Sequence, residues 1–245
     1  MAKRNFIRKP KRRRHGTSFW DHEYAAGGGN LALSTDPGED LEKFTRWLGR
    51  QKNIESLHQG ARVLDVGCGN GRNLVFLAQE FRIRGTGFDS STAAIKEAKE
   101  LGAALPLSFS VSSMAEPLLC ADKSQDLVLD MMASHFLDEA GRTQLRNEIH
   151  RVLKPGGWLF LKTFLRDEDL HTERLLKDYP AKEANTYIHP VIGVPEHVYF
   201  ESELLEFYEE RFIVHKVYRS HQHRSKGKAR KRRTISVYLQ KDPYQ

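Results

Sequence analysis

The chain has 245 residues, 39% of them hydrophobic, which is enough to bury the core of one large α/β domain. No stretch approaches the roughly 18 or more uncharged apolar residues of a membrane span, and no apolar segment follows the basic start as in a secretory signal. The two cysteines, Cys68 and Cys120, are too few for a disulfide framework and lack paired metal-ligand spacing. We therefore expect a soluble, cytoplasmic protein with no membrane contact and no metal.

The formal net charge of +7 is concentrated in two short segments. Residues 3–14 and residues 219–233 each hold eight lysines and arginines and no acid, and the rest of the chain has 23 basic against 32 acidic residues. Clustered cations gain free energy by displacing counterions from phosphate chains, so this pattern favours RNA or the ribosome as a partner, although solvated tails have the same composition. The candidate nucleic-acid contacts are Arg12, Arg13, Arg14, Arg230, Lys231, Arg232 and Arg233.

Three regions are expected along the chain: a disordered basic arm at 1–16, a lid and helix at 17–58, and a main domain at 59–245 that contains the basic loop 219–233. In the main domain short β-rich runs alternate with helical ones, which is typical of a parallel sheet covered on both faces. Strands are predicted at Arg62–Val66, Ile83–Asp89, Leu107–Val111, Asp126–Met131, Trp158–Phe164, Phe212–Tyr218 and Thr234–Gln240. Helices are predicted at Leu41–Leu57, Asn73–Glu80, Thr92–Leu101, Glu139–Val152 and Ser202–Glu210. The last two strands should form an antiparallel closing pair at the sheet edge, making seven strands.

The most informative segment is residues 63–73, where an apolar strand runs into Gly67, Gly69 and Gly71 and then into a helix. Glycines are needed where the backbone turns tightly and where a Cβ would meet a bound ligand. A dinucleotide site requires Gly-x-Gly-x-x-Gly, which fails here because no glycine stands at the sixth position from Gly67 or Gly69. Gly-x-Gly-x-Gly preceded by Asp65 instead resembles the first motif of class I methyltransferases, in which the acid helps to hold the amino acid part of S-adenosylmethionine.

The resemblance continues along the chain from about residue 60 to residue 165. Asp89 ends the second strand eighteen residues after Gly71, where a carboxylate can accept hydrogen bonds from both ribose hydroxyls. Residues 124–136 and 148–160 are similar to the fourth-strand motif and the Arg-Val-Leu-Lys-Pro-Gly-Gly segment of the same superfamily, of the ubiquinone-biosynthesis-like and tellurite-resistance-like type. The resemblance implies a Rossmann-like α/β fold with a seven-stranded, mostly parallel sheet, and S-adenosylmethionine as the cofactor. A degenerate, non-catalytic relative is the alternative.

Two features next to this core bear on cofactor binding. Family members often carry an acid for the adenine amino group after the third strand, but this chain has Ser112, Ser113 and Met114 there, so only packing of Met114 on adenine is expected. Residues 18–24 resemble the Trp-Asp-x-x-Tyr lid of relatives, although Trp20 and Tyr24 would equally suit plain helix packing. The expected cofactor-binding residues are Trp20, Tyr24, Asp65, Gly67, Cys68, Gly69, Asn70, Gly71, Asn73, Asp89, Ser90, Ser113, Met114, Asp130 and Met131.

Transfer from a sulfonium needs in-line placement of a nucleophile, and a base only if the acceptor holds a proton. The candidate bases are Asp130, at the end of the fourth strand, and His135, which follows it; both are expected to project from the edge that faces the methyl donor, with structural roles as the alternative for each. The fourth strand lacks the Asn/Asp-Pro-Pro-Tyr/Phe motif that holds planar amino groups, which disfavours methylation of an exocyclic amine. By analogy, the segment before the next helix supplies a substrate wall made of Tyr187, His189 and His197.

Three classes of function remain open on these residues. The first is a methyltransferase that acts on RNA or a ribosome-associated target, and its support is electrostatic. The second is a methyltransferase of small molecules or proteins whose basic segments aid solubility or contact a partner. The third is a cofactor-binding assembly factor that methylates nothing.

Overall fold

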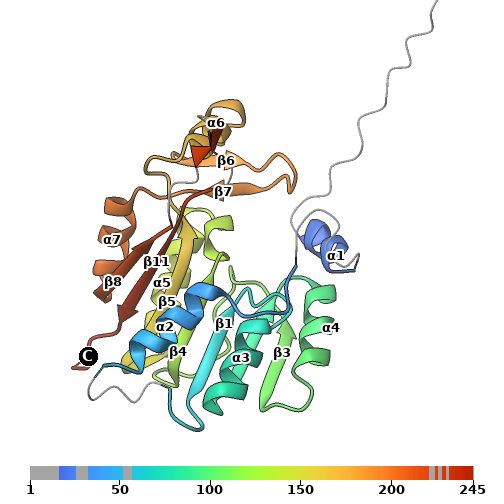
Figure 1. The fold of residues 1–245 in the computed structure, drawn as a ribbon, viewed down its shortest axis with the longest axis vertical. Coiled ribbons are helices and arrows are strands. Elements are labelled where there is room, and N and C mark those ends of the chain that lie inside the picture. Colours follow the sequence, from blue (N-terminus) through green and yellow to red (C-terminus); the bar gives the residue numbers. More distant parts are fainter. Residues whose placement is uncertain are drawn as a thin grey trace, which may run out of the picture.

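Seven strands form one mixed sheet in the order β3-β2-β1-β4-β5-β11-β8 (Figure 1). The computed structural model describes residues 17–25, 33–51, 57–220, 224–225, 228–229 and 232–244. The strands are β1 (Arg62–Val66), β2 (Arg84–Asp89), β3 (Leu107–Val111), β4 (Gln125–Met131), β5 (Leu153–Phe164), β8 (Ile213–Arg219) and β11 (Thr234–Gln240). β1 to β5 are parallel, and β11 pairs antiparallel with both β5 and β8. The predicted Rossmann-like α/β fold is confirmed.

Helices cover both faces of the sheet because the strands carry apolar side chains on both. In β5, Trp158 and Phe160 belong to one buried cluster, whereas Leu159 and Leu161 belong to the other, as the alternation of a strand requires. The first cluster includes side chains of α2 (Glu39–Leu48), α3 (Arg72–Phe81) and α4 (Thr92–Leu101), and the second includes those of α5 (Glu139–Val152) and α7 (Glu201–Glu209). The sheet is thus the middle of three layers.

Several short elements gather at the edge of the sheet where the parallel strands end (Figure 1). They are α1 (Thr17–Ala25), the 3-10 helix η1 (Ser134–Phe136), α6 (Leu170–Asp178), β6 (Thr186–Ile188), β7 (Pro195–His197), β9 (Arg224–Ser225) and β10 (Lys228–Ala229). β6 and β7 form an antiparallel hairpin, β7 contacts η1, and β10 contacts α6. Ligand sites of open α/β sheets lie outside this edge, so these elements surround the expected site.

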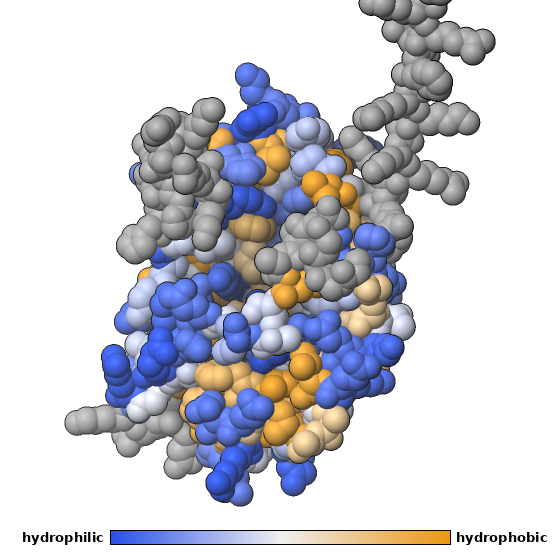
Figure 2. Space-filling view, turned by 45° about the vertical axis from the view of Figure 1, so that its right-hand side comes forward, coloured by the Kyte–Doolittle hydropathy of each residue, from blue (hydrophilic) through white to orange (hydrophobic). Residues whose placement is uncertain are grey.

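The surface is polar over most of the face shown in Figure 2, where hydrophobic residues form separate groups between hydrophilic ones. Within the described ranges, no helix has the length and apolar character needed to cross a membrane.

Two boundaries differ by several residues from the sequence-based expectations, and some elements were not predicted. Helix α2 ends at Leu48 and not at Leu57, because Gly49 caps it and donates its N–H to the carbonyl of Thr45 at 3.0 Å. β5 begins at Leu153, and the proline and glycine turn falls inside its irregular first part. The elements η1, α6, β6, β7, β9 and β10 were not predicted. Of these, η1 and the four strands have only two or three residues, which is too short to show a readable period.

Replacing Phe44 by alanine tests the packing of α2 on the sheet. The buried Phe44 ring stacks on Phe160 at 5.0 Å between ring centroids and meets Tyr238 edge-on at 4.8 Å. Loss of a buried phenylalanine leaves a cavity, so we expect Phe44→Ala to lower the free energy of unfolding by about 3–5 kcal/mol in denaturant titrations. Tyr244→Ala is the control, because Tyr244 is 98% exposed and its loss should change stability little. Equal stability of the two variants would refute this account of the core.

Candidate active site

A cavity of about 500 Å³ lies where β1, β2 and β4 end, and it is bounded by residues of α1 and by Phe136 and Val194. Its volume is in the range of pockets that hold small ligands and cofactors. The structure brings twelve of the fifteen expected cofactor residues to its wall: Trp20, Tyr24, Gly67, Cys68, Gly69, Asn70, Asn73, Asp89, Ser90, Ser113, Met114 and Met131. Asp65, Gly71 and Asp130 do not line it.

The glycine loop forms the floor of the cavity through a left-handed backbone. Gly69 and Gly71 have φ values of 55° and 75°, which side chains other than glycine rarely adopt. A Cβ at Gly71 would meet the ring of Phe109 at 2.7 Å, so this glycine allows the helix α3 to pack close to the sheet. A Cβ at Gly69 would collide with the hydroxyl of Tyr24 above the loop. Gly69 therefore lets the Tyr24 hydroxyl approach the loop closely, while Gly71 serves packing behind the loop.

Acidic side chains converge at the ends of the strands. Asp89, at the end of β2, accepts hydrogen bonds from the backbone N–H of Gly69 at 3.0 Å and of Ser91 at 2.8 Å. Burial raises the pKa of Asp89 more than these hydrogen bonds lower it. Burial, and then the charges of Asp89 and Asp130, raise the pKa of Asp65 well above its usual range, and one oxygen of Asp65 has no hydrogen-bond partner in the described chain. This cluster of carboxyls favours a ligand with positive charge and with hydroxyl donors.

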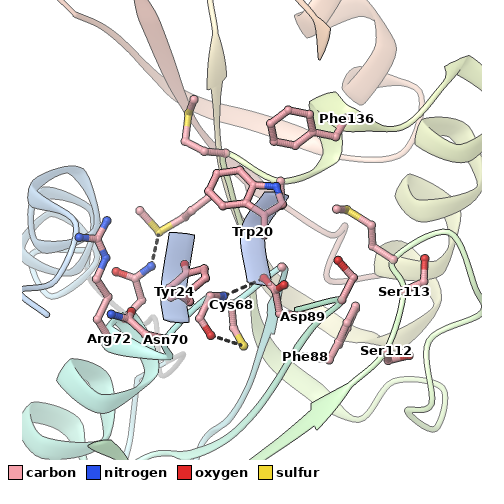
Figure 3. A pocket seen from close by; sticks show the side chains of 18 of the residues that line it. Trp20, Tyr24, Cys68, Asn70, Arg72, Phe88, Asp89, Ser112, Ser113 and Phe136 are labelled. Atoms are coloured by element: carbon pink, nitrogen blue, oxygen red, sulfur yellow. Dashed lines mark hydrogen bonds between the residues drawn. The ribbon is translucent and has the colours of Figure 1, made fainter. Parts of the chain in front are cut away.

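The N-terminal helix α1 supplies Trp20 and Tyr24 to the wall of the cavity. Asp21 accepts hydrogen bonds from the hydroxyl of Ser91 at 2.7 Å and from the N–H of Ala93 at 3.2 Å, which ties α1 to the first turn of α4. Figure 3 shows Trp20 between Phe136 and Asp89, and Tyr24 pointing toward the glycine loop. The two aromatic side chains thus form part of the cavity wall.

A second segment of the cavity wall, the loop before α2, was not predicted from the sequence. The loop before α2 is held against the glycine loop because Asn70 donates to the carbonyl of Ser34 at 3.2 Å, and Asn73 accepts from the N–H of Gly38 at 3.0 Å. Leu33 and Ser34 thereby line the cavity. Residues 34–38 read as an ordinary turn before a helix, so nothing in their sequence indicates contact with a ligand.

The two candidate bases lie behind the cavity wall and not on it. Asp130 is fully buried on the face of β4 opposite to Met131, since neighbouring residues of a strand alternate, and burial raises its pKa to about 6. His135 is 1% exposed, its ring lies 4.3 Å from that of Phe136, and burial lowers its pKa to about 4. His135 is therefore neutral at physiological pH. The expected projection of both groups toward the methyl donor is not what the structure shows.

The three expected substrate residues belong to the β6–β7 hairpin, which reaches the cavity through Val194. The buried Tyr187 donates its hydroxyl to Glu196 on the opposite strand. His197 bonds the hydroxyl of Thr186 at 2.9 Å, and burial, ahead of nearby positive charge, lowers its pKa to about 3. His189 accepts two backbone N–H groups of its own turn, and burial lowers its pKa as well. These side chains stabilise the hairpin, and none of them lines the cavity.

Of the expected nucleic-acid residues, only Arg232 and Arg233 fall in the part that is described. Arg232 pairs with Glu196, and Arg233 donates to the carbonyl of Asp167 at 2.7 Å, with side chains only 12% and 11% exposed. Both guanidinium groups thus face protein carboxylates and carbonyls. Arg12, Arg13, Arg14, Arg230 and Lys231 lie outside the described residues.

Comparison with known proteins agrees with this geometry. Residues 63–157 match the family model of a methyltransferase domain. Over 153 residues, 61% of this chain and 54% of the relative, the sequence is 31% identical to a fatty-acid O-methyltransferase of Mycolicibacterium smegmatis. Over 128 residues, 52% of this chain and 30% of the relative, it is 28% identical to a tRNA (carboxymethyluridine(34)-5-O)-methyltransferase of Arabidopsis thaliana.

Solved structures show the same fold. A SAM-dependent methyltransferase from Methanosarcina mazei superposes with a TM-score of 0.66 at 23% identity, over 84% of this chain and 99% of that one. The chain spans about half the length of the first curated relatives it matches. Residues 63–157 thus match a methyltransferase domain, and the resemblance to class I S-adenosylmethionine-dependent methyltransferases that the motifs predicted is confirmed.

S-adenosylmethionine fits the residues of the cavity. Its sulfonium and ammonium groups are cations, which suit the carboxylate of Asp89 on the cavity wall. The buried Asp65, which does not line the cavity, adds to this cluster of acids and has one oxygen without a hydrogen-bond partner in the described chain. The ribose hydroxyls of S-adenosylmethionine are donors that suit Asp89, and Met114 and Phe88 offer apolar surface for the adenine. When bound, the cofactor supplies an electrophilic methyl group.

Gly69→Ala should abolish binding of S-adenosylhomocysteine, measured by calorimetry, because the new methyl group collides with the hydroxyl of Tyr24 on the cavity wall and strains a left-handed backbone. Gly60→Ala is a matched control. Gly60 also has a positive φ, 85°, but a Cβ there meets nothing within 4 Å. Both variants carry backbone strain, so retained binding in Gly69→Ala would mean that the cofactor does not use this loop.

Asp89→Asn should weaken S-adenosylhomocysteine binding by about 1.5–3 kcal/mol, the size of hydrogen bonds to a charged group. Because burial raises the pKa of Asp89, wild-type affinity should fall as pH drops through that raised pKa, and the asparagine variant should lose this part of the pH dependence. Asp178→Asn, a half-exposed carboxylate on α6, is the control that should leave affinity and pH profile unchanged. An identical profile in Asp89→Asn and the wild type would remove Asp89 from the binding site.

Proposed function

We propose that this methyltransferase domain transfers the methyl group of S-adenosylmethionine to an oxygen atom of an RNA. The observation that carries methyl transfer is the cavity itself, which the glycine loop and Asp89 line together with Phe136 and Val194. We assign the glycine loop and Asp89 to the methyl donor, and Phe136 and Val194 to the acceptor side of the cavity. Further observations support RNA as the acceptor molecule and oxygen as the acceptor atom.

The chemistry assigned to the protein is positioning. The methyl carbon of a sulfonium is attacked in line, so an enzyme can act by holding the acceptor and excluding water. Trp20 and Tyr24 on α1, with Phe136, supply the apolar cover for that purpose. The neutral His135 and the buried Asp130 stay behind this cover and are available to position neighbouring elements.

The register of the last strands supports RNA as the acceptor. Thr234, the first residue of β11, pairs with Phe164 at the end of β5, and Ile235 pairs with Arg219 at the end of β8. The basic loop 219–233 therefore leaves and re-enters the sheet at the edge where the cavity lies. Its cations would meet a polyanion beside the methyl donor, and the gain from counterion release favours such a partner.

The relatives support an oxygen acceptor. One of them is named for O-methyl transfer to a fatty acid and another for O-methyl transfer to a tRNA. The first of these favours a small carboxylic acid as the second candidate acceptor. A cofactor-binding assembly factor without transfer is the third possibility that an experiment has to separate.

The acceptor is tested by incubating the full chain with S-adenosylmethionine labelled in its methyl group and with separated RNA, protein and small-molecule fractions. We expect the label in RNA, in a bond to oxygen. Label only in small molecules would favour the second candidate, and cofactor binding without any transfer would favour the assembly factor.

RNA affinity should depend on the basic segments. Replacing Arg12, Arg13, Arg14, Arg230 and Lys231 by glutamine should weaken RNA binding and flatten its dependence on salt by roughly 0.7–0.9 units of slope per lost phosphate contact. Arg232 and Arg233 are left unchanged because they pair with acids inside the fold. The control replaces five exposed cations elsewhere, Arg82, Arg84, Lys96, Lys99 and Lys123. Equal losses of RNA affinity in both variants would indicate unspecific electrostatic attraction. Unchanged RNA affinity in the variant of the basic segments would refute the proposal.

A further inference from the structure

A buried polar cluster lies next to the acceptor side of the cavity, centred on Arg232. The guanidinium carbon of Arg232 lies 3.3 Å from the centroid of the Phe164 ring and 5.3 Å from that of Tyr187. Its Nη1 pairs with the carboxylate of Glu196, which also accepts the hydroxyl of Tyr187. Arg232 is thus fixed by one carboxylate oxygen and by two aromatic rings.

Two further donors of Arg232 stand without partners. Its Nε and Nη2 are buried and make no hydrogen bond within the described part of the chain, and the same holds for both ring nitrogens of His135. The centroid of the His135 ring lies 5.2 Å from that of Phe164, so His135 and Arg232 contact the same aromatic side chain. Buried donors in proteins are nearly always paired, and leaving a charged donor unpaired is costly. The arrangement indicates recognition of a hydrogen-bond acceptor.

The geometry of these donors indicates which acceptor. Nε and Nη2 are the two atoms through which Arg219 of this same chain binds both oxygens of the Glu201 carboxylate. Arg232 presents the same edge of its guanidinium group, but at a side chain that is 12% exposed instead of 49%. A planar fork of two N–H groups matches a carboxylate in a bidentate pair.

The cluster adjoins the wall of the cofactor cavity on two sides. His135 lies 4.3 Å, between ring centroids, from Phe136, and Glu196 follows two residues after Val194. Phe136 and Val194 both line the cavity and are the residues assigned to its acceptor side. A group held by Arg232 therefore belongs to a molecule that approaches from the acceptor side.

We propose that Arg232, with His135 beside it, binds a carboxylate group of the methyl acceptor and so orients the acceptor toward the cofactor. This inference rests on the proposed methyl transfer. Glu196 already neutralises the guanidinium group, so a second, singly charged and planar anion is better accepted than a phosphate dianion. The carboxylate can belong to a small acid or to a modified RNA base, and the two sources are separated below.

The charges around His135 predict how this binding depends on pH. Glu196, Arg232, His189, Arg142 and His197 are the titratable groups that face it. The free protein holds His135 neutral, because burial lowers its pKa to about 4. A carboxylate bound beside the ring favours the protonated form, so binding should take up a proton, and affinity should fall as pH rises.

The test measures binding of benzoate to the full chain saturated with S-adenosylhomocysteine, by calorimetry in buffers of different ionisation enthalpy. We expect benzoate to bind with proton uptake and benzamide, which has the same shape without charge, to bind at least about 10-fold more weakly. Arg232→Gln should lower benzoate affinity by a similar factor. Arg219→Gln is the matched control, because it removes an exposed arginine with the same fork and should leave benzoate binding unchanged.

Two further variants keep the test decisive if Arg232→Gln fails to fold. Glu196→Gln retains the arginine and removes the competing negative charge, so benzoate should bind at least as tightly as to the wild type. His135→Gln should abolish the proton uptake while S-adenosylhomocysteine still binds. If benzoate inhibits the transfer of labelled methyl groups to RNA, the carboxylate belongs to the RNA acceptor. If benzoate leaves the labelling of RNA unchanged, the carboxylate belongs to a small acid.

Several results would overturn the inference. Equal binding of benzoate and benzamide, no benzoate binding to a protein that binds S-adenosylhomocysteine, or preference for inorganic phosphate would each exclude a carboxylate site. These failures are distinct from failure of the proposed function, which would appear as absent cofactor binding or absent transfer of label to RNA.

Discussion

The site depends on one hydrogen bond that joins the ends of two neighbouring strands. Asp89, at the end of β2, accepts the N–H of Gly69 in the loop that follows β1, and so sets the distance between the glycine loop and the second strand. The next residues of the chain begin α4, and Ser91 donates its hydroxyl to Asp21 of the lid. Residues at the end of β2 therefore position both the glycine loop and helix α1 around the cavity.

This arrangement costs stability, and the cost is tied to the ligand. Asp65 and Asp130 are buried with one oxygen each unpartnered in the described chain, and burial raises both pKa values. Groups of this kind lower the free energy of unfolding when they ionise and are retained where a ligand needs them. A cationic cofactor near Asp65 offsets part of the penalty, so binding and stability are linked.

The sequence was sufficient for the fold and for the cofactor half of the cavity, because both are written in local patterns. Strand and helix periods gave the sheet, and Gly69 and Asp89 stand at motif positions. The acceptor half depends on long-range pairing. Arg232 was expected to bind phosphate because it lies in a basic run, but it turns inward to Glu196, 36 residues away in sequence. Asp130 does not line the cavity because it points to the face of β4 opposite to that of its neighbour Met131. The residue composition of the strand does not determine which of the two faces the cavity.

The antiparallel pair β8 and β11 has a consequence for how such a protein can diversify. The basic loop begins and ends on adjacent strands at one edge of the sheet, so its length and composition can change without moving the strands that hold the donor. Its described residues are bound to the fold through Arg219, which pairs with Glu201, through β10, which contacts α6, and through Arg232 and Arg233. Under the proposed RNA binding, substitutions elsewhere in the loop would alter the choice of target separately from the chemistry, so natural selection could exchange targets while the reaction is kept.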